Sequence, residues 1–185
     1  FQKIWKGVAE NLDTSQSYPR LSGETGGKKF HFIHQSADVE SAVNQTIRGA
    51  FDYQGQKCSA TSRLYVPSDM WQNGGFRDQL VEGTKALKMG CSRDFESFLT
   101  AVIDRTSFDR IKTYLDSAKA SSDCEILTGG NCDDSKGYFI EPTIIVTKDP
   151  HYETMCNELF GPVLTVHVYD EKNYEDTLKM CSETS

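Results

Sequence analysis

The stretch Lys29-Phe-His-Phe-Ile-His34, together with the strand that follows it in the chain, decides the fold. These six residues are rich in aromatic and β-branched side chains, which favours a β-strand. Ser36 is then predicted to be an N-cap, and apolar residues at helical spacing predict a helix that runs to about Phe51. Arg63-Leu-Tyr-Val66 predicts the next strand, which Pro67 ends. A strand, a helix and a strand in succession indicate a parallel pair.

Strand and helix patterns also alternate in the rest of the chain, which predicts an α/β fold with a largely parallel sheet flanked by helices. A short strand is expected at Tyr18–Leu21, and Gly74-Gly75 is expected to weaken the helix that contains it. The remaining expected helices are 1–12, 69–87 and 107–120, and the remaining expected strands are 125–128, 144–146 and 163–168.

The composition describes a globular chain of 185 residues with 37% hydrophobic and 25% charged residues. A net charge of −7 argues against nucleic acid as a partner, because phosphate binding needs a basic surface. No apolar run approaches the ~20 residues needed to cross a membrane, so no membrane partner is expected. The chain begins at Phe1 and ends just after a helical pattern, and we therefore expect it to be a segment of a longer protein.

The six cysteines form no Cys-x-x-Cys pair and no cluster with zinc-like spacing, so no metal site is expected. His31 and His34 are three residues apart in an expected strand and would face opposite sides. A disulfide set remains formally open because the number of cysteines is even. Reduced thiols are the preferred interpretation for a chain of this size.

Cys58 is the first candidate for chemistry, because it lies in the polar turn Gln54-Gly-Gln-Lys-Cys-Ser59. A thiolate is the reactive form of cysteine, and the neighbouring Lys57 is expected to favour it. On local context alone, an inert cysteine is the commoner case.

Two acidic segments are the other candidates. Glu24 lies in a glycine-rich turn, where a carboxylate could activate water near the thiol. In Asn157-Glu-Leu-Phe-Gly-Pro-Val163, Glu158 could accept hydrogen bonds from ribose hydroxyls, and Phe160 could pack on a flat ring. Taken singly, Glu24 is better explained as an acid in a solvated loop, and the second segment is better explained as a turn before a strand.

In combination, these segments resemble the aldehyde dehydrogenase superfamily. The order Gly23-Glu-Thr-Gly-Gly-Lys28, Gly55-Gln-Lys-Cys58 and Glu158-Leu-Phe-Gly-Pro162 is similar to that of its base, nucleophile and cofactor motifs. Gly137-Tyr-Phe-Ile-Glu-Pro-Thr143 is similar to a further recurrent stretch. Three stretches, Gly55-Gln-Lys-Cys-Ser-Ala60, Arg63-Leu-Tyr-Val-Pro67 and Gly26-Gly-Lys-Lys-Phe-His-Phe32, look most like the pyrroline-5-carboxylate dehydrogenase branch, which oxidises glutamate γ-semialdehyde to glutamate in proline breakdown. One departure is Lys29, where Asn is expected.

The resemblance implies a role for each candidate residue. Cys58 would attack the aldehyde, and Glu24 would activate the water that hydrolyses the resulting thioester. The backbone N–H of Cys58 would stabilise the developing oxyanion. Glu158 would hold the nicotinamide ribose of NAD and Phe160 would pack near its ring. Ser59 and Lys57 would meet the substrate carboxylate.

The resemblance also implies a domain organisation. Residues 1–24 would be the C-terminal end of an NAD-binding domain, and 25–185 would be a truncated aldehyde dehydrogenase catalytic domain. The parent enzyme would be a homo-oligomer in the mitochondrial matrix, a location implied only by resemblance. Because a second oxyanion donor and most of the dinucleotide-binding sheet would lie outside the chain, we expect this segment alone to be inactive. The severed interfaces would expose apolar surface, so we also expect the segment to self-associate.

Three alternatives remain open. The substrate could be a different aldehyde. The chain could be a thiol hydrolase that pairs Cys58 with a histidine base, although no histidine lies in a recognisable partner motif. It could also be a non-catalytic assembly domain, against which the presence of both Cys58 and Glu24 argues.

Overall fold

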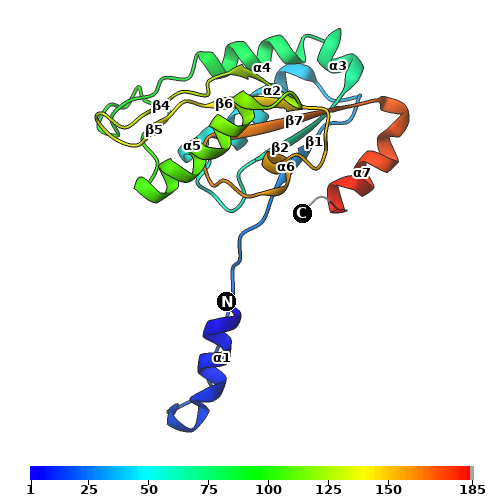
Figure 1. Cartoon of the computed structure of the whole chain (residues 1–185). Helices are drawn as coiled ribbons and strands as arrows, with labels where there is room; N and C mark the ends of the chain where they lie inside the picture. The colour runs from blue at the N-terminus through cyan, green and yellow to red at the C-terminus, as the bar shows by residue number, and fades with distance from the viewer. Residues whose placement is uncertain (184–185) are drawn as a thin grey trace.

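The computed structural model describes residues 1–183, and its centre is a five-stranded sheet (Figure 1). The strands lie in the order β1-β2-β7-β6-β3, in which the first four are parallel and β3 is antiparallel to β6. The predicted α/β fold with a largely parallel sheet is confirmed. The strands are β1 (Phe30–Phe32), β2 (Arg63–Pro67), β3 (Cys124–Thr128), β6 (Thr143–Thr147) and β7 (Val163–Tyr169), and a separate hairpin consists of β4 (Cys132–Asp133) and β5 (Phe139–Ile140).

Helices cover both faces of the sheet (Figure 1). Because successive strand residues point to opposite faces, Ile144 belongs to one core and Ile145 to the other. The first core is closed by α2 (Val39–Phe51), α3 (Ser68–Gln72) and α4 (Phe76–Lys85), and the second by α5 (Arg105–Ala120). Each fully buried aliphatic side chain stabilises the fold by about 1.5–3 kcal/mol.

Aspartates, not serines, cap the two long helices. Asp38 accepts a hydrogen bond from the backbone N–H of Ser41 at 2.8 Å, and Asp104 accepts one from that of Ser107 at 2.7 Å. The prediction that Ser36 caps α2 was therefore wrong, because its side chain bonds instead to His34 Nδ1. An aspartate at this position also places negative charge at the positive end of the helix.

The helix expected over 69–87 is two helices. α3 ends at Gln72 and α4 begins at Phe76, with Gly75 in the left-handed region at φ 74°. A side chain at Gly74 would lie 2.8 Å from the backbone oxygen of Met70. The two glycines therefore interrupt the helix and do not merely weaken it.

The N-terminal segment stands apart from the sheet (Figure 1). It consists of α1 (Gln2–Glu10), η1 (Leu12–Thr14) and an extended stretch that leads to β1. The short strand expected at Tyr18–Leu21 is absent, because this extended stretch pairs with no other strand among the described residues.

The C-terminal end lies beside the sheet. It consists of η3 (Glu171–Asn173) and α7 (Tyr174–Glu183), which follow β7. Within residues 1–183, every helix is too short or too polar to span a bilayer.

Candidate active site

Three segments singled out in the sequence each precede a parallel strand. The segment around Glu24 leads into β1, that around Cys58 into β2, and that around Glu158 into β7. Because β1, β2 and β7 are adjacent and parallel, their amino ends lie at one edge of the sheet. The three segments, distant in the sequence, therefore meet at this edge.

The turn before Cys58 is held in an unusual conformation. In η2 (Asp52–Gly55), Tyr53, Gln54 and Gly55 all have positive φ, at 56°, 59° and 66°. The buried Gln54 side chain fixes the turn by donating through Nε2 to Thr100 Oγ1 at 2.7 Å. Left-handed conformations cost energy for residues other than glycine, and they are concentrated at functional sites.

Cys58 and Glu24 lie together at the surface of this edge. Both residues are exposed, and the hydrogen bond that the thiol donates to the Glu24 carboxylate, together with the negative charge of that carboxylate, raises the pKa of the Cys58 thiol. The positive charge of Lys29 lowers the pKa of Cys58, but this influence is smaller than that of Glu24. The carboxylate thus lies where it can exchange a proton with the sulfur or with a water molecule beside it.

Lys57 does not have the electrostatic role that was expected of it. Its ammonium is paired with the Asp52 carboxylate at 2.5 Å, and Lys29 is the cation among the largest influences on the pKa of Cys58. Asp52 therefore offsets the charge that was expected to favour the thiolate, and Lys29 is a cation that does favour it. Ser59 is exposed beside the thiol.

The Glu158 segment packs against both of the other segments. A side chain at Gly26 would lie 2.3 Å from Glu158 Oε2, so the absence of a Cβ allows the carboxylate to approach this backbone. A side chain at Gly55 would similarly lie 2.3 Å from the backbone oxygen of Gly161. Phe160 has φ 53°, and its ring remains 41% exposed. The half-buried carboxylate and the exposed ring together offer a polar and a flat apolar contact to a ligand.

Two buried cations in the same region were missed from the sequence. Lys28 is 7% exposed and Arg63 is 1% exposed, and Arg63 Nη2 donates to the Lys28 backbone oxygen at 2.7 Å. Burial, and secondarily the charge of Arg63, lowers the pKa of Lys28 to about 7, while Glu158 and Cys156 act to raise it. Lysine is seldom buried without a partner, but in the sequence Lys28 reads as part of a solvated loop.

The other cysteines and the histidines lie outside this edge or make local contacts. The six cysteines are all free thiols, which agrees with the expectation of reduced cysteines. His31 Nδ1 lies 3.0 Å from Thr46 Oγ1, and His34 bonds to Ser36. Within residues 1–183, no three His, Cys, Asp or Glu side chains are grouped as metal ligands.

Comparison with known proteins identifies the family. The sequence model described as the aldehyde dehydrogenase family matches residues 2–185. The chain belongs to this family. Curated members include the mitochondrial delta-1-pyrroline-5-carboxylate dehydrogenases of Dictyostelium discoideum, 57% identical over 187 residues, and of Homo sapiens, 51% identical over 186 residues. In both cases the match covers 100% of this chain and 33% of the relative.

Solved structures of the family share the fold. A delta-pyrroline-5-carboxylate dehydrogenase from Mycobacterium tuberculosis bound with NAD superposes with a TM-score of 0.85 and 40% identity, over 96% of this chain and 32% of that chain. An aldehyde dehydrogenase from Bacillus cereus superposes with a TM-score of 0.86 and 26% identity, over 100% of this chain and 35% of that one. The chain thus spans about a third of the length of its relatives.

Proposed function

We propose that this chain carries the nucleophile and the base of an NAD-dependent aldehyde dehydrogenase that oxidises glutamate γ-semialdehyde to glutamate in proline breakdown. The observation that carries the proposal is the contact between the Cys58 thiol and the Glu24 carboxylate at an exposed edge of the sheet. The names of the relatives, at 46–57% identity, support the choice of substrate.

Cys58 supplies the covalent step. Its sulfur bonds to the aldehyde carbon to give a hemithioacetal, and the thiol proton is passed to a base as the bond forms. The exposed position of the sulfur gives the aldehyde access to it. Oxidation of the hemithioacetal leaves a thioester on Cys58, which water must then cleave.

Glu24 supplies the proton transfers. In the resting site its carboxylate accepts a hydrogen bond from the thiol, so it can take the thiol proton when the sulfur attacks. Once the sulfur is acylated, the carboxylate is free to accept a proton from the attacking water. Hydrolysis gives the carboxylic acid product and returns the thiol.

The residues at this edge fit an NAD molecule. Gly26 leaves the space that the Glu158 carboxylate needs to approach the backbone, and this carboxylate can accept hydrogen bonds from ribose hydroxyls. The exposed ring of Phe160 offers a flat surface for the nicotinamide. When bound, NAD would accept the two electrons that the oxidation of the aldehyde releases.

Recognition of the substrate carboxylate is proposed for Ser59 and, to a smaller extent, Lys57. Ser59 offers an exposed hydroxyl beside the nucleophile. Lys57 is exposed but paired with Asp52, so it can contact a substrate anion only by sharing or leaving that pair. Ser59 is therefore the stronger candidate.

We propose that this activity belongs to a longer polypeptide, with residues 1–24 as the end of its NAD-binding domain and 25–185 as its catalytic domain. The support is that relatives are about three times as long as this chain. We further propose a homo-oligomeric enzyme in mitochondria, the compartment that the names of several relatives give.

The proposal is tested with the full-length protein by following NADH formation with glutamate γ-semialdehyde and with propanal. We expect kcat/KM to be at least roughly 100-fold higher for the semialdehyde, and Cys58→Ser to abolish activity. A preference for propanal would reject the substrate assignment. Turnover of a thioester or ester without NAD, and none of an aldehyde with it, would favour a thiol hydrolase.

The 185-residue chain alone is predicted to produce NADH at a rate negligible beside the full-length protein. Catalysis needs the cofactor and the nucleophile to be held together, and relatives extend well beyond the matched region. NADH formation measured at equal molar concentrations checks this. Comparable rates for the two proteins would contradict the proposed domain organisation.

A further inference from the structure

We propose that Gln54 and Gln56 are positioning residues for Cys58. Their side-chain amides tie the turn before the nucleophile to residues 100–103, and this tie holds the thiol against the Glu24 carboxylate. Both residues act through the backbone that carries the sulfur. The inference deepens the proposed function and rests on it only where turnover is concerned.

The turn before Cys58 needs a restraint from outside itself. Tyr53 and Gln54 have φ 56° and 59°, in a region that residues other than glycine occupy only at a cost in energy. A turn of this kind relaxes unless other contacts hold it. Because Cys58 follows within a few residues, relaxation of the turn would redirect its thiol.

Gln54 restrains the turn through its amide nitrogen. Its side chain is 5% exposed, and Nε2 donates to Thr100 Oγ1 at 2.7 Å and to the Ala101 backbone oxygen at 3.2 Å. A carbonyl oxygen can only accept, so the nitrogen end of the amide must face it. Both hydrogens of the amide nitrogen are therefore used by one short segment that is distant in the sequence.

Gln56 contacts the same segment through its amide oxygen. Its Oε1 accepts a hydrogen bond from the backbone N–H of Ile103 at 3.0 Å. The backbone N–H of Gln56 donates to the Tyr53 oxygen at 3.1 Å, which closes the turn two residues before Cys58. The two glutamines thus bind the segment with complementary groups, a donor at position 54 and an acceptor at position 56.

Residues 100–103 are themselves anchored to the fold. Val102 is 3% exposed, and its backbone N–H donates to the Tyr138 backbone oxygen at 2.9 Å. Val102 thus bonds to the stretch that leads into β5, while Ala101 and Ile103 on either side of it bond to the glutamines. The segment is therefore a fixed support for the turn.

The first arm of the test examines the thiol in the full-length protein without NAD or substrate. Iodoacetamide labelling from about pH 6 to about pH 10, read by mass spectrometry, gives the apparent pKa of Cys58. The Glu24 carboxylate raises this pKa and the charge of Lys29 lowers it to a smaller extent. If Gln54→Met lets the thiol move away from Glu24, the apparent pKa falls.

We expect Gln54→Met to lower the apparent pKa of Cys58 and to accelerate its labelling at pH 7.5 roughly two- to fivefold. In a Glu24→Gln background the same substitution should have no further effect, because the contact that it loosens is already lost. Equal effects in the two backgrounds, or none in the wild type, would overturn the proposal. Should Gln54→Met not fold, Gln56→Met, at a half-buried position, replaces it with the same expected result.

The second arm removes the contact from its other end. Thr100→Val nearly keeps the shape of the side chain but deletes the hydroxyl that accepts from Gln54, whereas Thr100→Ser keeps the hydroxyl. With glutamate γ-semialdehyde and NAD, we expect kcat to fall roughly three- to tenfold in Thr100→Val, with KM changed less than roughly twofold. Thr100→Ser should retain the wild-type kcat. An unchanged kcat in natively folded Thr100→Val would overturn the proposal.

Two controls separate positioning from a general loss of structure. Thr113→Val, the same exchange on the exposed side of α5, should change neither kcat nor KM. Asp38→Ala removes the cap of α2 at the end remote from Cys58, and it should lower the melting temperature while leaving kcat and the labelling of Cys58 unchanged. If Asp38→Ala lowers kcat as much as Thr100→Val at an equal loss of melting temperature, the role of the glutamines is only structural and the proposal is overturned.

Failure of the proposed function has a different signature. If the full-length protein forms no NADH from the semialdehyde, the proposed function fails. The labelling experiment needs neither NAD nor substrate, so it still decides whether the glutamines hold Cys58 against Glu24.

Discussion

At the scale of single residues, the hydrogen bond between Cys58 and Glu24 keeps the thiol protonated in the resting site. The carboxylate raises the pKa of the thiol, and the charge of Lys29 only partly offsets this effect. A thiol that is protonated at rest is protected from oxidation, since the thiolate is the form that oxidants attack. Its activation must then accompany substrate binding, when the proton can move to Glu24.

Replacing the base should therefore make the thiol more reactive while stopping turnover. In Glu24→Gln the negative charge is gone, the pKa of Cys58 falls, and iodoacetamide labelling at pH 7.5 is predicted to accelerate roughly two- to tenfold. Labelling of Cys91, an exposed thiol in another loop, serves as the internal control and should not change. Slower labelling of Cys58 would contradict the assignment of Glu24 as its hydrogen-bond partner.

The sequence indicated which side chains lie at the candidate site, but not which charged residues act on one another there. Cys58, Glu24, Glu158 and Phe160, which the motifs singled out, all belong to loops at one edge of the sheet. The expected cation was assigned to Lys57 because it adjoins Cys58 in sequence. Adjacent residues in a turn point in different directions, and Lys57 instead pairs with Asp52.

At the scale of elements, the site depends on loops at the amino ends of three neighbouring strands. The loop that carries Cys58 and the loop that carries Glu158 touch through Gly55 and Gly161. Two features require glycine at position 55. Its φ is 66°, in the left-handed region, and a Cβ would lie 2.3 Å from the backbone oxygen of Gly161. The close approach of these two backbones is what joins the nucleophile to the proposed cofactor contact.

The substitution Gly55→Ala should be markedly more destabilising than a matched change at Gly75. Both glycines have positive φ, but the nearest atom to a Cβ at Gly75 is 3.5 Å away, on a flexible side chain. We expect Gly75→Ala to cost about 1–2 kcal/mol, the penalty of the left-handed backbone, and Gly55→Ala at least about 1 kcal/mol more. Urea unfolding followed by circular dichroism measures both, and equal losses would show that the two loops are not in contact.

Most strands and helices were predictable because their apolar residues repeat at the spacing of each element. The errors occurred where a helix cap or a pairing partner decides the outcome. Asp38 competes with Ser36 for the helix cap, and its carboxylate is the stronger acceptor for a backbone N–H. The short strand expected at Tyr18–Leu21 had favourable residues but has no neighbouring strand to pair with.

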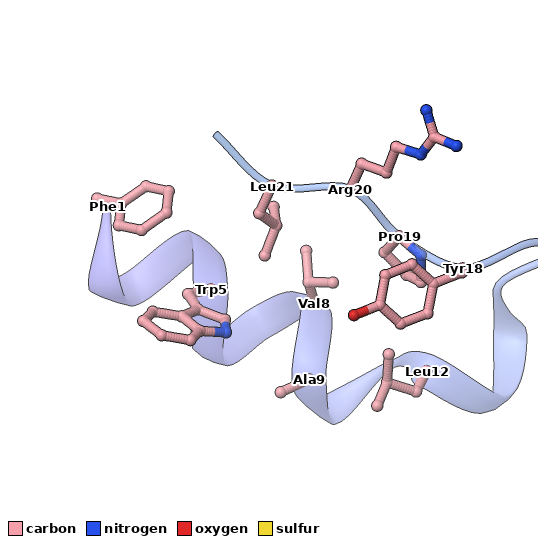
Figure 2. Close-up of a pocket in the computed structure, with 9 residues that line it drawn as sticks. All are labelled: Phe1, Trp5, Val8, Ala9, Leu12, Tyr18, Pro19, Arg20 and Leu21. Atoms are coloured by element: carbon pink, nitrogen blue, oxygen red, sulfur yellow. The ribbon is translucent and has the colours of Figure 1, made fainter. Parts of the chain in front are cut away.

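At the scale of the whole molecule, the N-terminal segment exposes an apolar groove (Figure 2). Trp5 and Val8 on α1 face Tyr18 and Leu21 on the returning chain, and the groove between them encloses about 670 Å³. Trp5 is 58% exposed and Tyr18 is 88% exposed. So much apolar surface on a segment that stands away from the sheet favours association with other apolar surfaces.

The isolated chain is accordingly predicted to self-associate. Light scattering at about 100 μM should give a mass above that of a monomer, and Trp5→Ser should shift the population toward monomer. Lys3→Ser, on the same helix, should leave the mass unchanged, because Lys3 is not part of the groove. A monodisperse monomer for the unmodified chain would mean that the groove drives no association.

The central claim is that Cys58 becomes acylated in an NAD-dependent step and that Glu24 promotes removal of the acyl group. Mass spectrometry of full-length Glu24→Gln, quenched in acid after mixing with glutamate γ-semialdehyde, tests this most directly. The account predicts a thioester adduct on the peptide that contains Cys58, formed only when NAD is present, because hydrolysis without the base slows by about 10²–10⁴. An adduct on a different cysteine, or none on Cys58 while the wild type turns over normally, would contradict it.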